Sequence, residues 1–134
     1  MDFNLNPGIK NTKEYIVGEA DVTRHLGEDA PVFATPQMIN WMEYTCLESI
    51  REFLPEGYDS VGAAVDVAHL APTPMGMKVK VMSELSEVKG GLLTFKVEAY
   101  DEECKIGEGT HRRGSIPVEK FYNKILEKAA RVKK

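Results

Sequence analysis

Glu43 occupies an unusual position for a charged residue, at the margin of the apolar side of a helical segment and next to Ile39 and Ile50. A carboxylate held there could act as a general base or as a nucleophile. The alternative is structural, because a glutamate at a helix edge often pairs with an arginine. The residue and its neighbours alone favour this structural alternative.

His69 is the second candidate, because it ends a run of small apolar residues just before a proline-rich break. That position predicts the rim of a sheet, where an imidazole can transfer protons near neutral pH. A single histidine at a strand end more often has a structural role. His25 and His111 have no stronger claim, and the spacing of the histidines and of Cys46 and Cys104 does not fit a metal site.

Thr35 is expected to be the N-cap of the same helical segment, with Pro36 as its first helical residue. At a rise of about 1.5 Å per residue, Thr35 and Glu43 lie roughly 12 Å apart along the helix axis and do not hydrogen-bond directly. A substrate carbonyl, a water or His69 could lie between them if they share a site. The N–H groups of the first helical turn would then stabilise a developing oxyanion.

The central element is expected to be a helix over Val32–Leu54, because its apolar residues recur at helical spacing on one side. The residues on that side, around Met42, are Thr35, Met38, Ile39, Cys46, Ser49, Ile50 and Phe53.

The period changes from 3.6 to 2 after this helix, which predicts strands joined by short turns and therefore an antiparallel sheet. The expected strands are Glu14–Val22 at an edge, Ser60–His69, Met77–Val88, Leu92–Tyr100 and Lys105–Ile116, and the chain ends in an amphipathic helix over Pro117–Val132. Within Ser60–His69 one face is expected to carry Val61, Ala63, Val65, Val67 and His69. A helix packed on such a sheet of about five strands is an α+β fold.

The 134 residues are expected to form one domain, 1–134, with a loose N-terminal arm over residues 1–11. The net charge of −4 argues against nucleic-acid binding. No apolar run approaches the ~18–20 residues of a membrane span, and the N-terminal sequence lacks the pattern of a signal peptide. The two cysteines are expected to be free thiols in a cytoplasmic protein.

Four stretches together resemble the hotdog-fold acyl-CoA thioesterases, and most closely their fluoroacetyl-CoA thioesterase branch. They are Arg24-His25-Leu26, Ala34-Thr35 followed by Met42-Glu43, Gly62 to His69 with Thr73-Pro74 and Gly76, and Gly107 to Arg113. The last helix extends the likeness with Glu119-Lys120-Phe121 and Asn123-Lys124, so that it covers roughly residues 14–125. The order and spacing of these stretches carry the resemblance, since each motif alone is weak.

The resemblance implies a hotdog fold, a homodimer with active sites between its subunits, and hydrolysis of a small acyl-CoA thioester. No cofactor or metal is implied, since CoA is part of the substrate. The catalytic residues of that branch fall here on Thr35, Glu43 and His69, and its substrate-binding residues fall on Gly62 and Arg113.

The fluoroacetyl-specific member carries a longer segment with phenylalanines, which acts as a lid, before the catalytic threonine. Here only residues 27–34 intervene, and Phe33 is their single aromatic residue. Thioester hydrolysis is therefore carried over from this family, and its fluoroacetyl specificity is not. The alternatives are an enoyl-CoA hydratase or dehydratase, with Asp66 and His69 as the only hint, and a non-catalytic hotdog dimer that binds acyl-CoA.

Overall fold

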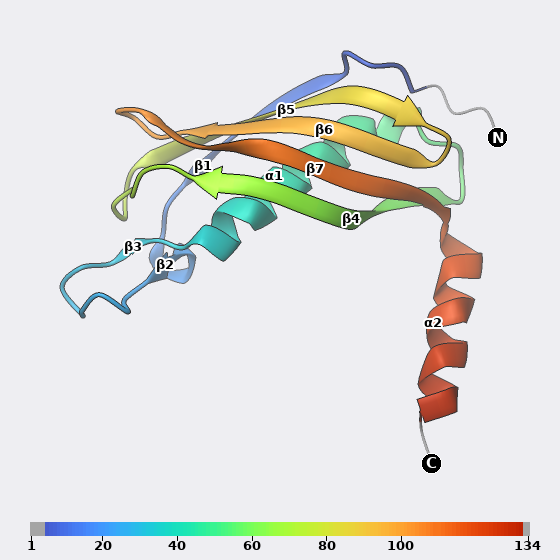
Figure 1. Cartoon of the computed structure of the whole chain (residues 1–134). Helices are drawn as coiled ribbons and strands as arrows, with labels where there is room; N and C mark the ends of the chain where they lie inside the picture. The colour runs from blue at the N-terminus through green and yellow to red at the C-terminus, as the bar shows by residue number, and fades with distance from the viewer. Residues whose placement is uncertain (1–4, 133–134) are drawn as a thin grey trace.

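A computed structural model describes residues 5–132 as a long helix on a curved antiparallel sheet, followed by a C-terminal helix (Figure 1). The elements are β1 (Lys10–Ile16), β2 (Val22–Thr23), β3 (Val32–Phe33), α1 (Thr35–Ile50), β4 (Tyr58–His69), β5 (Lys78–Lys89), β6 (Leu92–Tyr100), β7 (Lys105–Pro117) and α2 (Val118–Val132), with 3-10 turns at Glu19–Asp21 and Arg51–Phe53. Five strands form the main sheet in the order β1-β5-β6-β7-β4, and β2 pairs with β3 separately. The expected α+β class is confirmed.

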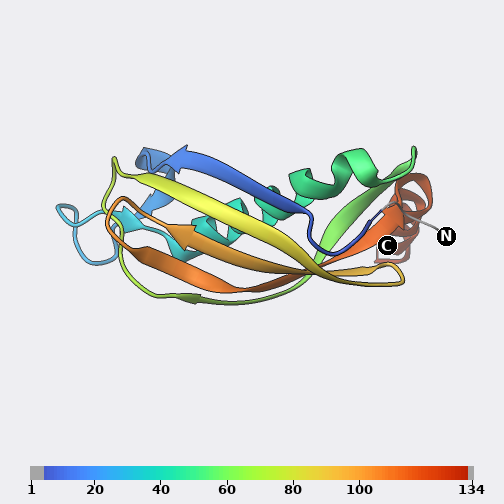
Figure 2. The same ribbon diagram turned by 90° about the horizontal axis from the view of Figure 1, so that it is seen from above.

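The core lies between α1 and the inner face of the sheet, which curves around the helix from β1 at one edge to β4 at the other (Figure 2). The alternation expected for β6 is confirmed, because Leu93, Phe95, Val97 and Ala99 are all buried. Each large apolar side chain that leaves water in this way contributes about 1.5–3 kcal/mol to folding. The long helix is therefore held along its length by the sheet.

The central helix is shorter than expected, since α1 begins at Thr35 and its α-helical part ends at Ile50. Its buried side is also wider, because Trp41 and Thr45 are buried as well. Tyr15 of β1 stacks on Trp41 with ring centroids 4.3 Å apart. The extra burial is a consequence of the sheet wrapping around the helix, which helical periodicity alone does not reveal.

The first strand lies at a sheet edge as expected, but it begins at Lys10 instead of Glu14 and ends at Ile16. Residues 5–11 are not a loose arm, because Leu5 is buried and Leu85 N–H donates to the carbonyl oxygen of Ile9 (2.8 Å). Residues 1–4 lie outside the described residues. The apolar signal of this strand is weak because its residues are mostly polar. A polar sequence is expected for an edge strand whose residues are alternately exposed.

β4 contains a β-bulge that changes which residues share a face. Gly62 pairs with Arg113 and Ala64 pairs with Arg112, so Ala63 is an extra residue in the ladder. The expectation that the face with Val67 and His69 carries Val61 and not Gly62 is therefore wrong. Gly62 faces α1 before the bulge, and Val67 and His69 face it after the bulge.

β4 is the other edge of the sheet, and residues 62–66 on it are exposed. α2 follows β7 and extends away from the sheet on the β4 side (Figure 1). The amphipathic helix expected at this position is thus confirmed, but none of its residues is buried. Within residues 5–132, neither helix combines the length and the apolar character needed to cross a bilayer.

Candidate active site

Thr35 and His69 are brought together by the fold, with Thr35 Oγ1 2.6 Å from Nδ1 of His69. Thr35 is the first residue of α1 and His69 is the last residue of β4. The expected N-cap role of Thr35 is wrong, because Ala34 is the N-cap and no side chain caps the helix. The hydroxyl instead hydrogen-bonds the histidine. No local sequence pattern predicts this contact, because 34 residues separate the two.

The His69 ring is held in a partly buried position where it is electrically neutral at pH 7. Burial lowers its pKa from the ordinary value of 6.5. The ring of Phe33 lies edge-on to it with centroids 6.2 Å apart. Within the described part of the chain, Nε2 of His69 is buried without a hydrogen-bond partner. A neutral imidazole bonded to a hydroxyl can accept a proton from it or pass one on.

Glu43 lies against the backbone of β4 at the bulge. A Cβ placed on Gly62 would be 3.4 Å from Oε1 of Glu43 and 3.5 Å from Cε1 of His111. The glycine therefore leaves open the space directly in front of the carboxylate. The alternative in which Glu43 pairs with an arginine is not favoured, because the nearby Arg113 directs its hydrogen bonds to other groups.

Arg113 is buried, with 4% of its surface exposed, and it links β7 to β4. Its Nε donates to Ser60 Oγ (2.7 Å), its Nη2 donates to the Ser60 carbonyl oxygen (2.9 Å), and its Nη1 lies 3.1 Å from Nε2 of His111. These contacts support a structural role for Arg113, and its expected substrate-binding role stays a prediction. Its guanidinium points into the protein beneath Gly62 and not toward solvent.

His111 is a site residue that sequence reasoning dismissed. It is 1% exposed, and its Nδ1 lies 3.0 Å from the carbonyl oxygen of Ala64. Burial lowers its pKa, so the ring is neutral, donates from Nδ1 and accepts from Arg113 at Nε2. Ser60 and Ala64 lie on either side of the bulge, and Arg113 and His111 therefore hold the bulge in place. The signal in the sequence was the two-residue spacing of His111 and Arg113 on one strand face.

The predicted catalytic residues form two separate groups in one chain. Thr35 contacts His69, and Glu43 contacts Gly62. Along α1 the threonine and the glutamate are roughly 12 Å apart. Along β4, the glycine and the histidine are seven residues apart, or roughly 20 Å at the rise of a strand. Within a single chain the two groups therefore lie apart, and we call each of them a half-site.

An open cavity of about 550 Å³ lies beside the Thr35–His69 pair. It is lined by Thr23, His25, Leu26, Val32, Phe33, Ala34, Thr35, Pro36, His69, Leu70, Ala71 and Pro72. We call it the Thr35 groove. Its walls are mostly apolar, and Leu26 lies in the loop between β2 and β3, just before residues 27–34. Phe33 is instead fixed in β3, packed on Trp41 with ring centroids 4.7 Å apart.

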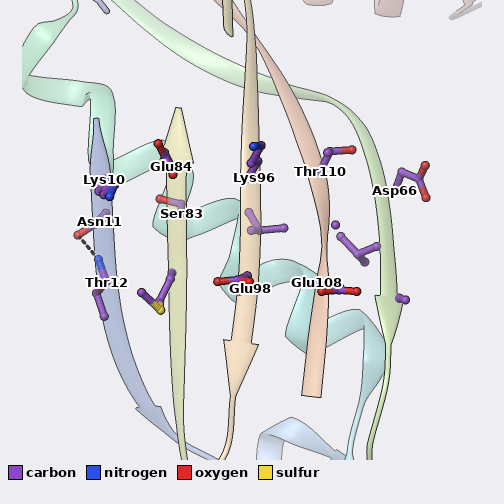
Figure 3. A pocket seen from close by; sticks show the side chains of 15 residues that line it. Lys10, Asn11, Thr12, Asp66, Ser83, Glu84, Lys96, Glu98, Glu108 and Thr110 are labelled. Carbon is purple, nitrogen blue, oxygen red and sulfur yellow. Dashed lines mark hydrogen bonds between the residues drawn. The ribbon is translucent and has the colours of Figure 1, made fainter. Parts of the chain in front are cut away.

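A larger hollow of about 830 Å³ lies on the face of the sheet opposite α1, where polar and charged side chains stand on all five strands (Figure 3). It contains Asp66, whereas His69 lines the Thr35 groove. The two residues that hinted at a hydratase therefore face opposite sides of the sheet. None of the five predicted site residues lines this hollow.

No metal-ligand cluster is found in the part of the chain that the structure describes, and neither cysteine lines the Thr35 groove. No group of three His, Cys, Asp or Glu residues within it could hold a metal ion. Both cysteines are free thiols, and burial raises the pKa of Cys46 to about 12. That thiol stays protonated and is a poor nucleophile.

Residues 17–119 match the model of the family described as fluoroacetyl-CoA-specific thioesterase. The chain is 36% identical to the fluoroacetyl-CoA thioesterase of Streptantibioticus cattleyicolor, over 96% of this chain and 97% of that protein. A solved structure of a mutant of the fluoroacetyl-CoA-specific thioesterase FlK, in complex with fluoroacetate and CoA, is 37% identical, with a TM-score of 0.79 over 87% of this chain and 99% of that one.

A hot-dog-like protein from Thermanaerovibrio acidaminovorans superimposes with a TM-score of 0.87 at 23% identity, over 96% of this chain and 97% of that one. This likeness confirms the hotdog fold that the sequence motifs implied. The family match covers the stretches that carry Thr35, Glu43 and His69. The chain belongs to the fluoroacetyl-CoA-specific thioesterase family.

Proposed function

We propose that this protein hydrolyses the thioester of a small acyl-CoA to a carboxylate and free CoA. The observation that carries the proposal is the hydrogen bond between Thr35 and neutral His69 at the side of an open apolar groove. Its relative from Streptantibioticus cattleyicolor is a thioesterase for fluoroacetyl-CoA, and a mutant of FlK holds fluoroacetate and CoA. The free thiols support a cytoplasmic location.

The active protein in this proposal is a homodimer that joins the two half-sites. The outer edge of β4 has backbone donors and acceptors available for another strand, and its exposed residues around Ala63 and Ala64 are small. If two copies pair antiparallel along β4, with a two-fold axis between Val65 and Asp66, Gly62 of one chain lies opposite His69 of the partner subunit. Glu43 of one chain would then share a site with the Thr35–His69 pair of the other.

Glu43 acts on the thioester carbonyl in this mechanism, by one of two routes. As a general base it removes a proton from water while the water oxygen bonds to the carbonyl carbon. As a nucleophile it bonds to that carbon itself, and water then cleaves the resulting anhydride. In both routes the carbon–sulfur bond breaks, and CoA leaves with the electron pair and receives a proton.

Thr35 and His69 orient the reacting groups and move the proton. The Thr35 hydroxyl hydrogen-bonds the attacking oxygen or the acyl group, and His69 supplies a path for the proton to the leaving sulfur. The N–H groups of the first turn of α1, beside Thr35, stabilise negative charge on the carbonyl oxygen. Gly62 lets the acyl group approach the strand in front of Glu43.

The acyl group in this proposal is small and does not need fluorine. The loop between β2 and β3 offers Leu26 and no phenylalanine, since Phe33 is fixed on Trp41. The ratio of kcat/KM for fluoroacetyl-CoA to that for acetyl-CoA is therefore expected to stay within about tenfold, as a pocket contact with one small group allows. A preference for fluoroacetyl-CoA far beyond this ratio would assign the relative's specificity to this chain.

The test of the function is free-thiol release from a panel of acyl-CoAs, from short to long, with wild type and Glu43→Gln. The glutamine is expected to reduce kcat by about 10²- to 10⁴-fold, the range that a positioned base contributes. Glu52→Gln is the matched control, because Glu52 is exposed in the 3-10 turn after α1. Full activity of Glu43→Gln would end the carboxylate mechanism. Tight binding of CoA esters without thiol release would favour a non-catalytic binding protein.

A further inference from the structure

α2 is an amphipathic helix whose apolar side is mostly exposed among the described residues 5–132. The apolar side chains Val118, Phe121, Tyr122, Ile125, Leu126, Ala129 and Val132 lie along one side of the helix at helical spacing. Tyr122 is 58% exposed and Ile125 is 49% exposed. We call this side the α2 stripe.

The α2 stripe needs a partner for physical reasons. An isolated helix of about 15 residues is marginal in water, and most helices in proteins are stabilised by packing of their apolar face. The chain itself packs α2 only at its start, where Val118 N–H donates to the carbonyl oxygen of Gly57 (2.9 Å) and Phe121 is partly buried. The rest of the stripe is exposed in the single chain.

The proposed dimer brings the α2 stripe to a defined place. α2 starts beside the Tyr58 end of β4 and extends past the β4 edge (Figure 1). Antiparallel pairing along β4 places this end of one chain beside the His69 end of the other. α2 of one chain must therefore run along the loop that follows His69 in its partner.

That loop offers a surface that complements the helix. Leu70 is 50% exposed and Met75 is 41% exposed. The loop is held to the turn between β6 and β7 by a hydrogen bond from Thr73 Oγ1 to a carboxylate oxygen of Asp101 (2.9 Å). This turn is acidic, since Asp101 is followed by Glu102 and Glu103, and Lys128 of α2 borders the stripe at helical spacing.

We propose that the α2 stripe packs on the Leu70–Met75 loop and the acidic turn 101–103 of a second copy of this chain. The inference rests on the dimer of the proposed function, and it adds a specific role for α2. Leu70 also lines the Thr35 groove, so α2 supports one wall of the groove in the partner subunit. Each active site then depends on the partner for two elements, the β4 edge and α2.

Cys104 provides a native probe of this contact, because it is exposed in the same turn, whereas Cys46 is buried. The experiment introduces single cysteines at Tyr122 and at Leu126, on the stripe, and treats the full-length dimer with a short bis-maleimide. Glu127→Cys, on the opposite side of the helix, is the matched control. Covalent dimers are expected from the two stripe variants, weakly or not at all from the control, and not in a Cys104→Ser background.

A second measurement follows hydrogen exchange in α2 with Ile125→Asp and its control Asn123→Asp. The stripe variant is expected to speed exchange of α2 amides at least about tenfold, while the control and the dimeric mass stay unchanged. If the protein is dimeric but forms no cross-links through Cys104, the α2 contact is overturned. The proposed hydrolysis is unaffected by that result, because thiol release measures it separately. A monomeric wild type would overturn the contact together with the dimer. Protection of α2 only on anionic vesicles would overturn it in favour of a membrane surface.

Discussion

The side-chain oxygen of Thr35 lies 2.6 Å from Nδ1 of His69, joining the first residue of the central helix to the last residue of an edge strand. The contact fixes the imidazole at the side of the groove and gives the hydroxyl a role other than capping its helix. Both side chains reach the groove, so a substrate can meet them together.

Removing the Thr35 hydroxyl is expected to impair catalysis and leave the fold intact. Thr35→Val keeps the shape of the side chain, and we expect a loss of about 100-fold in kcat, comparable to losing one oriented hydrogen-bond donor. Thr35→Ser is the matched control and should retain most of the activity. The unfolding free energy should change by less than about 0.5 kcal/mol, since Thr35 is exposed. Equal activity of Thr35→Val and wild type would remove Thr35 from the mechanism.

The pH dependence of activity should reflect His69. Burial lowers its pKa below the ordinary value of 6.5, so the ring stays neutral and able to accept a proton at pH 6.5 and somewhat below. We expect kcat/KM to fall only when the pH drops through that lowered pKa. His69→Gln should lose this acid limb, and His25→Ala, which changes an exposed histidine, should keep it.

The same burial predicts the direction of a stability change. His69 and His111 both have lowered pKa values in the folded chain, so below about pH 7 the unfolded chain binds more protons than the folded chain. The unfolding free energy should therefore decrease as the pH falls through 6.5 toward the folded pKa values. Urea unfolding at a series of pH values, with His69→Gln beside wild type, measures this. A flatter curve for the variant is the expected sign.

A side chain at Gly62 should interfere with substrate and not with folding. The Cβ of Gly62→Ala would lie 3.4 Å from Oε1 of Glu43, an ordinary contact, but it would occupy the space in front of the carboxylate. We expect KM to rise or kcat to fall by about tenfold, a change typical of one misfitted methyl group. Gly114→Ala is the control, because a Cβ there meets nothing within 4 Å. Wild-type kinetics for Gly62→Ala would show that substrate does not approach this strand.

Arg113 is expected to contribute mainly to the stability of the fold, since its side chain is buried. Arg113→Met leaves Ser60 and His111 without their donor, and we expect a loss of about 2–4 kcal/mol in unfolding free energy. Arg112→Met, on the exposed face of the same strand, should cost little. An Arg113→Met protein of normal stability with a raised KM for acyl-CoA would instead support the phosphate-binding role that the family resemblance implied.

The order of the long helix, the main strands and the last helix could be predicted from the sequence, because helical and two-residue periodicities are local signals. β6 has the predicted bounds Leu92–Tyr100, and a short turn joins it to β5 as predicted. The mostly polar β1 was misplaced, since an edge strand carries a weaker apolar signal. The order and spacing of the motifs also predict Thr35, Glu43 and His69 as the catalytic residues.

Only the tertiary structure decided how those residues meet. The bulge at Ala63 depends on pairing with β7, a strand more than 40 residues away in the chain, and it decides that Gly62 faces Glu43. The same pairing brings Ser60 of β4 to Arg113 of β7, so that the Arg113 guanidinium bonds inward to Ser60 and to the neighbouring His111. Register between distant strands is set by their hydrogen bonds and packing, which no local pattern in one strand encodes.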